Sequence, residues 1–163
     1  MEMCKIMRNG KILILIIVLG FLLVSHVSAE GFELFINDQS VASGTLATIP
    51  VIIKNAEELA EVSFEISYDP AILKFSGADS GDISKNGIFE VSETKPGTIF
   101  INFVEDSGIS QDGEIMKLTF EVPGSIGSSA MINIIPKKIQ NLDKNDVPFN
   151  VRSGTIKVTG SGQ

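Results

Sequence analysis

Carboxylates are the plentiful side chains in this sequence that could take part in catalysis. They include three local pairs: Asp79 with Asp82, Glu105 with Asp106, and Asp143 with Asp146. Two carboxyl groups on opposite sides of a cleft could hydrolyse a glycosidic bond if an apolar pocket raised the pKa of one of them. Acidic pairs in turns are usually solvated instead. We therefore predict no catalytic residues and no enzyme activity.

A second candidate for chemistry is the acidic segment Asp143-Lys144-Asn145-Asp146, which offers the oxygen ligands that calcium prefers. It lacks the alternating ligands, the central glycine and the distal glutamate of an EF-hand loop. The segment is therefore predicted to be the polar tip of a hairpin. We expect no metal or other cofactor on this chain.

The first 29 residues have the pattern of a secretory signal peptide. A basic region with Lys5, Arg8 and Lys11 precedes an apolar run of 13 residues from 12 to 24, and Ala29 ends a cleavage site of small residues. The run is shorter than the ~20 residues of a spanning helix, so a cleaved leader is favoured over a retained anchor. The sequence therefore predicts export to the extracellular space or the cell surface, with membrane contact only if the leader is retained.

Removal of residues 1–29 limits the chemistry of the remaining chain. The only cysteine, Cys4, and the only histidine, His26, lie in this leader, and the whole sequence contains no tryptophan. The remainder can form no Ser-His-Asp triad, no cysteine nucleophile, no His/Cys zinc site and no disulfide. It keeps ten basic and 19 acidic residues, a net charge of −9. Neither nucleic acid nor an anionic membrane surface is expected as a partner.

Residues 30–163 carry the pattern of short strands separated by turns. Apolar and polar residues alternate over residues 62–68 and again over 116–122, which is the period of a strand with one buried face. Turn formers such as Asn86-Gly87 and Pro96-Gly97 stand between such runs. We predict a single all-β domain over residues 30–163, a sandwich or barrel of about nine strands.

One predicted strand is apolar on both faces. In residues 99–104 the odd-numbered positions can fill the core, which leaves Phe100 and Val104 pointing outward beside Asn102. Either neighbouring elements cover these outward residues, or the residues mark a binding surface.

Carbohydrate binding is an alternative function for an exported β-sandwich. Sugar sites usually present flat aromatic platforms, but the single tyrosine, Tyr68, shares a face with Phe64 and Ile66 and is expected to point into the core. A stacking platform is therefore not expected, which leaves recognition of a polysaccharide by polar groups alone. A third interpretation is a structural surface domain that pairs through an exposed strand edge.

The order of several motifs resembles the cohesin domains of cellulosome-type scaffoldins. Residues 62–73, VSFEISYDPAIL, are similar to the alternating strand and Y-D-P-x-x-L turn of cohesins, and Ser80-Gly81-Asp82 is similar to the P-G-D that follows. The strand 99–104, the segment Glu105-Asp106-Ser107-Gly108 and the closing strand 153–158 continue the resemblance, which runs from about residue 32 to residue 158.

The resemblance implies a jelly-roll β-sandwich of about nine strands that binds a partner and does not catalyse. Cohesins hold dockerins, calcium-loaded modules of two short helices carried by secreted proteins, against one face of the sandwich. The calcium is expected on the dockerin and not on this chain. The resemblance implies these partner-binding residues: Glu61, Ser63, Glu93, Phe100, Asn102, Val104, Glu105 and Gly108.

The sequence departs from the family at some of these positions. Many type I cohesins have an Asn and an Asp where this chain has Glu61 and Ser63, and an apolar residue where it has Asn102. Glu105 and Gly108 match the family pattern. The departures put type I specificity in question and leave dockerin binding as the expected function.

Three glutamates lead to a hypothesis about the partner. If Glu61, Glu93 and Glu105 surround Phe100 and Val104, the surface has an apolar centre and an acidic rim. Rim charges steer encounter, whereas the buried centre carries affinity. We therefore expect a partner helix with small or apolar residues in its middle and Lys or Arg at its edge.

Overall fold

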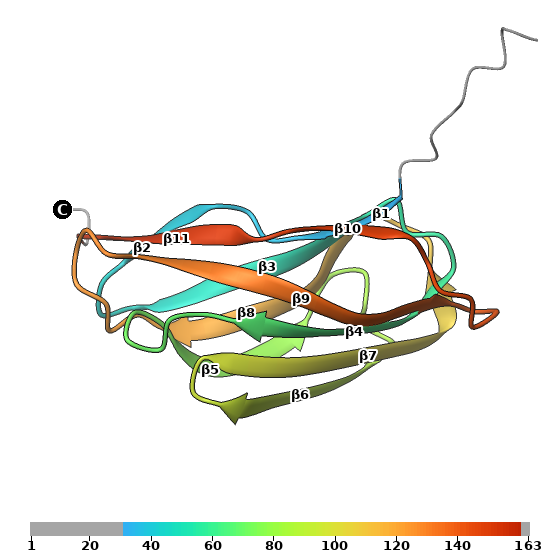
Figure 1. The fold of residues 1–163 in the computed structure, drawn as a ribbon, viewed down its shortest axis with the longest axis horizontal. Coiled ribbons are helices and arrows are strands. Elements are labelled where there is room, and N and C mark those ends of the chain that lie inside the picture. Colours follow the sequence, from blue (N-terminus) through green and yellow to red (C-terminus); the bar gives the residue numbers. More distant parts are fainter. Residues whose placement is uncertain (1–30, 161–163) are drawn as a thin grey trace, which may run out of the picture.

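The computed structural model describes residues 31–160, which form eleven strands (Figure 1). They are β1 (Phe32–Phe35), β2 (Gln39–Ala42), β3 (Leu46–Lys54), β4 (Leu59–Ser67), β5 (Lys74–Ser80), β6 (Ile88–Lys95), β7 (Thr98–Ile109), β8 (Gly113–Glu121), β9 (Ser129–Asn141), β10 (Phe149–Arg152) and β11 (Gly154–Thr159). The predicted signal peptide lies outside the described residues. Within residues 31–160, no helix is long and apolar enough to cross a membrane.

The strands form two sheets that pack face to face. One sheet has the order β10-β1-β3-β8-β5 and the other the order β2-β11-β9-β4-β7-β6. Figure 1 shows the six-stranded sheet lying across the five-stranded one. Most pairs are antiparallel, but β1 with β10 and β2 with β11 are parallel. The predicted all-β sandwich is confirmed.

The count of eleven strands exceeds the predicted nine because two stretches of chain contribute to both sheets. Ser153 alone separates β10 in the five-stranded sheet from β11 in the six-stranded sheet, and β1 passes into β2 in the same way after three residues. The two stretches cross closely at Gly154, where a Cβ atom would lie 2.7 Å from Ile36 Cγ2. Only glycine fits there. If β1 with β2, and β10 with β11, are each counted as one continuous strand, the total is the predicted nine.

Alternating residues of the two sheets build the core. Phe64 of β4, Phe103 of β7 and Phe120 of β8 are fully buried between the layers. The predicted inward position of Tyr68 is confirmed, and its ring meets the ring of Phe120 edge to face at 5.0 Å between centroids. Each such side chain contributes about 1.5–3 kcal/mol by burial, so packing alone can stabilise a domain without disulfides.

The strand β7 has the two faces that its sequence predicts. Ile99, Ile101 and Phe103 are completely buried, whereas Phe100 and Asn102 remain partly exposed. Val104 keeps 36% of its surface accessible. Inward residues therefore fix β7 in the core, and the alternate residues form the surface described next.

Candidate partner-binding surface

The outward surface of β9, β4, β7 and β6, called here the outer face, is organised in rows by strand register. In its middle row Ser63 of β4, which its neighbours cover to 7% exposure, lies opposite Asn102 of β7 on one side and Lys138 of β9 on the other. Asn102 in turn lies opposite Glu90 of β6. A polar row therefore crosses four strands.

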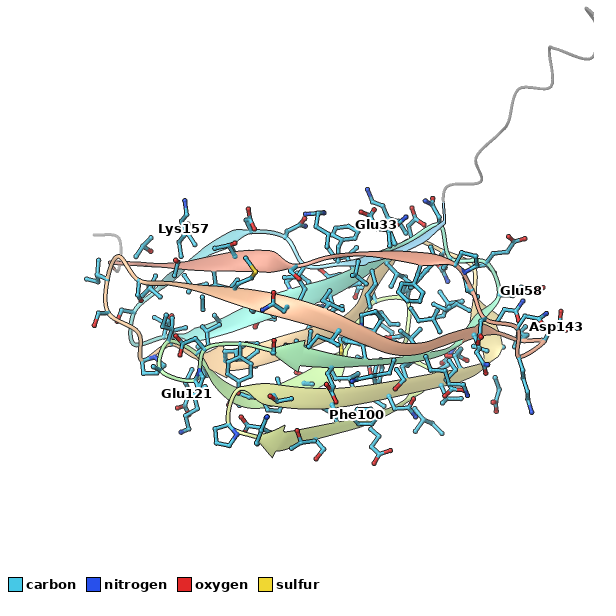
Figure 2. All side chains as sticks on the ribbon, in the orientation of Figure 1. Glu33, Glu58, Phe100, Glu121, Asp143 and Lys157 are labelled. Atoms are coloured by element: carbon cyan, nitrogen blue, oxygen red, sulfur yellow. The ribbon has the colours of Figure 1, made fainter. Side chains whose placement is uncertain are left out.

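Apolar side chains occupy the rows on either side. Val104 lies opposite Ile88 of β6, which is 76% exposed. Phe100, which Figure 2 shows on β7, lies opposite Ser92 of β6 and Glu65 of β4. We call Phe100, Asn102 and Val104 the β7 stripe. Its apolar members remain accessible to a partner.

Two ion pairs join β4 to β9 on this face. Lys138 Nζ lies 2.8 Å from Glu61 Oε2, and Lys137 Nζ lies 3.1 Å from Glu65 Oε2. Consecutive residues of a strand normally point to opposite faces. Here a register shift opposite Ser63 and Phe64 lets both lysines reach outward carboxylates. Glu61 is thus on the outer face, as predicted, but a lysine compensates its charge.

Glu93 does not join the outer face. It lies opposite the buried Ile99 in the β6–β7 register, so it points to the inner side of β6. There the Tyr68 hydroxyl donates a 2.6 Å hydrogen bond to Glu93 Oε1 and accepts one from the Phe75 backbone N–H at 3.3 Å. Glu93 therefore ties the edge strand β6 to the start of β5.

Burial raises the pKa of Tyr68 from 10.0 to about 12, and the hydrogen bond to Glu93 is the second largest cause of this increase. Because the folded pKa exceeds the unfolded one, this group's stabilisation is complete below pH 10 and is lost as the pH rises towards 12. Tyr68 is the only tyrosine and the sequence has no tryptophan, so the ultraviolet absorbance of tyrosinate reports this residue alone. We expect a titration midpoint well above that of the denatured chain, and a lower midpoint in Glu93→Gln. Equal midpoints for folded and denatured protein would contradict the contact.

Glu105 is placed beside the outer face but is buried, with 7% of its surface exposed. Its Oε1 accepts a 2.8 Å hydrogen bond from the Ser107 hydroxyl. The residue lines a shallow pocket of about 240 Å³ where β4, β7 and β9 end, together with Glu61, Val104 and Leu142. It is next to the predicted contacts and is not a freely exposed rim charge.

Gly108 has a structural reason to be glycine. Its φ of +69° lies in the left-handed region, and a Cβ there would come within 3.0 Å of Leu142 Cδ1 and 3.1 Å of the Glu58 carbonyl carbon. Its match to the family pattern is therefore explained by backbone conformation and packing as well as by any contact with a partner.

We expect Gly108→Ala to destabilise the fold by about 1–3 kcal/mol, because strain and crowding add together. Thermal unfolding measures the effect. Gly127→Ala is the matched control, since its φ of +89° is also left-handed but no atom lies within 4 Å of the added methyl. A Gly108→Ala loss no larger than that of Gly127→Ala would show that crowding contributes nothing.

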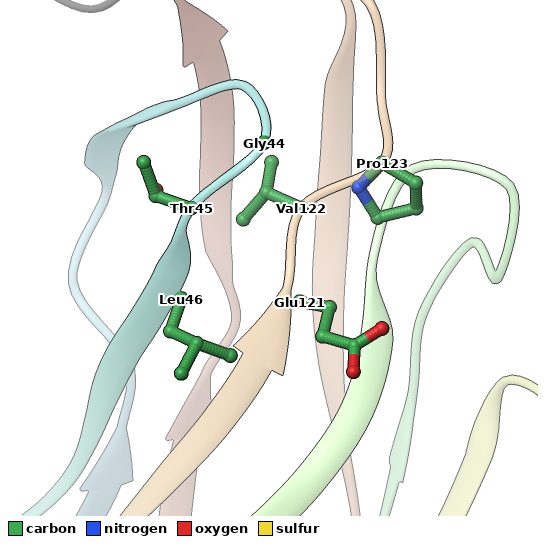
Figure 3. A pocket seen from close by; sticks show the side chains of 6 residues that line it. All are labelled: Gly44, Thr45, Leu46, Glu121, Val122 and Pro123. Atoms are coloured by element: carbon green, nitrogen blue, oxygen red, sulfur yellow. The ribbon is translucent and has the colours of Figure 1, made fainter.

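Of the three carboxylate pairs, Glu105 with Asp106 lines the same pocket as Lys144 of the hairpin tip. Asp143–Asp146 form a tight turn in which the Lys144 and Asn145 amides donate to the Asn141 carbonyl and side chain. No group of three or more His, Cys, Asp or Glu side chains in the described part of the chain could hold a metal ion. A pocket of about 460 Å³ between β3 and β8 (Figure 3) has a single carboxylate, Glu121, which pairs with Lys74 at 3.0 Å.

Sequence reasoning missed several residues of the outer face. These are Ile88, Glu90 and Ser92 of β6, and Ile135, Lys137 and Lys138 of β9. A usable signal existed for the lysines, since two adjacent cations beside an acidic alternating strand indicate ion pairing across strands. No comparable signal fixed β6, because Ile88 and Phe89 are both apolar and leave its inner face ambiguous.

Accessible apolar residues on the outer face of a two-sheet sandwich are typical of a protein-recognition surface. The family model described as cohesin domain matches residues 32–158. The chain therefore belongs to the cohesin family. Cohesin domains are non-catalytic protein-binding modules, which agrees with the prediction that the chain is not an enzyme.

Solved structures of cohesins have the same fold. A non-cellulosomal cohesin from Archaeoglobus fulgidus matches with a TM-score of 0.72 and 21% identity, over 78% of this chain and 91% of that one. The cohesin of the type I Coh-OlpA–Doc918 cohesin–dockerin complex from Clostridium thermocellum matches with a TM-score of 0.71 and 20% identity, over 79% and 99%.

A relative in sequence is cellulose-binding protein A of Clostridium cellulovorans, 25% identical over 119 residues. The match covers 70% of this chain and spans about 6% of the length of that relative. The similarity is therefore to one part of a much longer protein.

Proposed function

We propose that this protein binds a dockerin through its outer face, with the β7 stripe at the centre of the contact. The observation that carries the proposal is the accessible stripe Phe100–Asn102–Val104 on a four-stranded surface of a cohesin fold. The apolar members would be desolvated in the complex, and Asn102 and Glu90 would supply hydrogen bonds between them.

The comparisons support the type of partner. Several solved relatives with this fold are complexes of a cohesin with a dockerin. The departures at Glu61, Ser63 and Asn102 stand in the middle and end rows of the outer face, where they would alter which dockerin fits.

Calorimetric titration of the purified chain with dockerins from the same genome tests the proposal. We expect tight binding in the presence of calcium, and its loss when a chelator removes calcium from the dockerin. Retention of the folded chain on insoluble polysaccharide, with no dockerin bound, would favour the carbohydrate-binding alternative. Polymerisation of the pure chain that rises with concentration would favour pairing through a strand edge.

The same proposal includes export. The basic region and apolar run of residues 1–29 support removal of a signal peptide and an extracellular or cell-surface location. Mass spectrometry of the protein in the culture medium checks this, because cleavage after Ala29 leaves Glu30 as the first residue. An intact N-terminus in the membrane fraction would show that the leader is retained as an anchor.

A further inference from the structure

We propose that the outer face is electrically polarised across its strands. It binds a partner helix that carries Lys or Arg on the flank facing β6 and Asp or Glu on the flank facing β9. This inference rests on the proposed function, because it specifies the partner of the same surface. It replaces the uniformly acidic rim expected from the sequence.

Beside the middle row of the face, the β6 side carries an uncompensated negative charge, whereas the cation of this strand, Lys95, lies at its far end opposite Thr98. Glu90 is exposed and lies opposite Asn102 of the β7 stripe. It forms no ion pair with any residue of the described range 31–160. Of the glutamates expected at the rim, Glu93 is exposed but points to the inner side of β6, and Glu105 is buried.

On the β9 side the lysines are the more exposed members of their two ion pairs. In the Lys138–Glu61 pair the lysine side chain is 47% exposed and the glutamate 29%, and in the Lys137–Glu65 pair the values are 44% and 31%. Each lysine side chain is therefore more exposed than the glutamate side chain that it pairs with. An ammonium has three donor hydrogens, so each lysine can keep its glutamate and still bind a partner carboxylate.

The distance between these two sides suits one helix. Neighbouring strands are about 4.8 Å apart, so β6 and β9, separated by β7 and β4, lie roughly 14 Å apart. A helix with its side chains is about 10–12 Å wide. A helix whose axis lies between β7 and β4 therefore has one flank towards Glu90 and the other towards Lys137 and Lys138, whose side chains reach back to Glu65 and Glu61 of β4.

Two charge reversals separate this arrangement from a simple acidic surface. The rate of association with a dockerin that binds the wild-type chain is measured for Glu90→Lys and for Lys138→Glu at low ionic strength. A polarised partner is slowed by both changes, by about threefold or more, and the difference shrinks as salt is added. A uniformly basic partner is slowed by Glu90→Lys and accelerated by Lys138→Glu, which would overturn the inference. No change in either variant would also overturn it.

Matched controls separate local charge from net charge. Asp79→Lys on β5 changes net charge as Glu90→Lys does, on the other sheet. Lys74→Glu matches Lys138→Glu, because it also breaks a cross-strand ion pair, with Glu121 at 3.0 Å. Association rates of both controls are expected to stay near the wild-type value. Rates as slow as those of the outer-face variants would show that net charge alone is responsible.

A second experiment keeps the inference testable if no dockerin binds. Three helical peptides share an apolar stripe and carry Lys on one flank and Glu on the other, Lys on both, or Glu on both. Amide chemical shifts of the full chain at Ser63, Phe100 and Asn102 report binding. We expect the mixed peptide to bind about fivefold more tightly than either uniform one. Preference for the all-Lys peptide, or no preference, overturns the polarity, whereas absence of dockerin binding alone overturns only the proposed function.

Discussion

We expect Phe100→Asp to weaken dockerin binding by at least about 100-fold, a loss of roughly 3 kcal/mol, with the fold retained. Phe100 is the aromatic member of the β7 stripe, and its side chain points away from the core between Ser92 and Glu65. A carboxylate at this point would have to be desolvated without a partner when a helix covers it, which adds to the lost apolar contact. Isothermal titration calorimetry with a dockerin that binds the wild-type chain measures the change.

Phe149→Asp provides the control for this result. Phe149 is also aromatic and 42% exposed, but it lies on β10 at the edge of the five-stranded sheet. Its replacement introduces the same charge and removes the same ring without touching the outer face. Wild-type affinity in Phe100→Asp, with Phe149→Asp unchanged as well, would place the binding surface elsewhere on the sandwich.

The largest loss of stability is expected from Phe103→Ala, about 3–5 kcal/mol. Phe103 is fully buried, and its ring packs on that of Phe89 with centroids 4.6 Å apart. Gly87 also presses on the ring, since a Cβ there would lie 2.0 Å from Phe103 Cε2. These contacts leave little room for the structure to collapse into the cavity. Denaturant unfolding monitored by circular dichroism gives the free energy of unfolding.

The position of Phe103 also predicts which strand loses the most local stability in this variant. Phe89 comes from the edge strand β6, which has only β7 as a strand neighbour. Hydrogen exchange in Phe103→Ala should therefore accelerate more in β6 than in β4. Phe75→Ala, at the edge strand β5 and only partly buried, serves for comparison and should cost less. Uniform acceleration in all strands would show that β6 has no separate dependence on this ring.

Alternation in the sequence predicted the central strands because each of them has one face in a continuous core. The apolar residues Val62, Phe64 and Ile66 indicated which face of β4 is buried. Ile99, Ile101 and Phe103 indicated the buried face of β7 in the same way. The passage of chain from one sheet to the other could not be predicted in this way. The residues of β10 and β11 alternate locally, but only the completed sandwich shows that their partners belong to different sheets.

The outer face was predictable where it depends on these same strands. Glu61, Ser63, Phe100, Asn102 and Val104 all lie on it, as their alternation indicates. The prediction for Glu93 was wrong because it came from the family resemblance, whereas the pairing of Glu93 with the buried Ile99 turns it to the inner side of β6. Glu105 shares its parity with Ile99, Ile101 and Phe103, so its inward position was signalled by the sequence and was overridden by the family resemblance.

The parallel pairing of the outermost strands has a mechanical consequence. β1 pairs with β10 and β2 with β11 in parallel, and the described chain begins and ends at opposite ends of the sandwich (Figure 1). Tension applied through these two ends pulls the paired strands past each other along their length. The hydrogen bonds of each pair then share the load and must break together, whereas bonds that are peeled apart break one at a time. Because forced unfolding is governed by the unfolding rate, this shear arrangement would make the domain resist traction applied through these two ends.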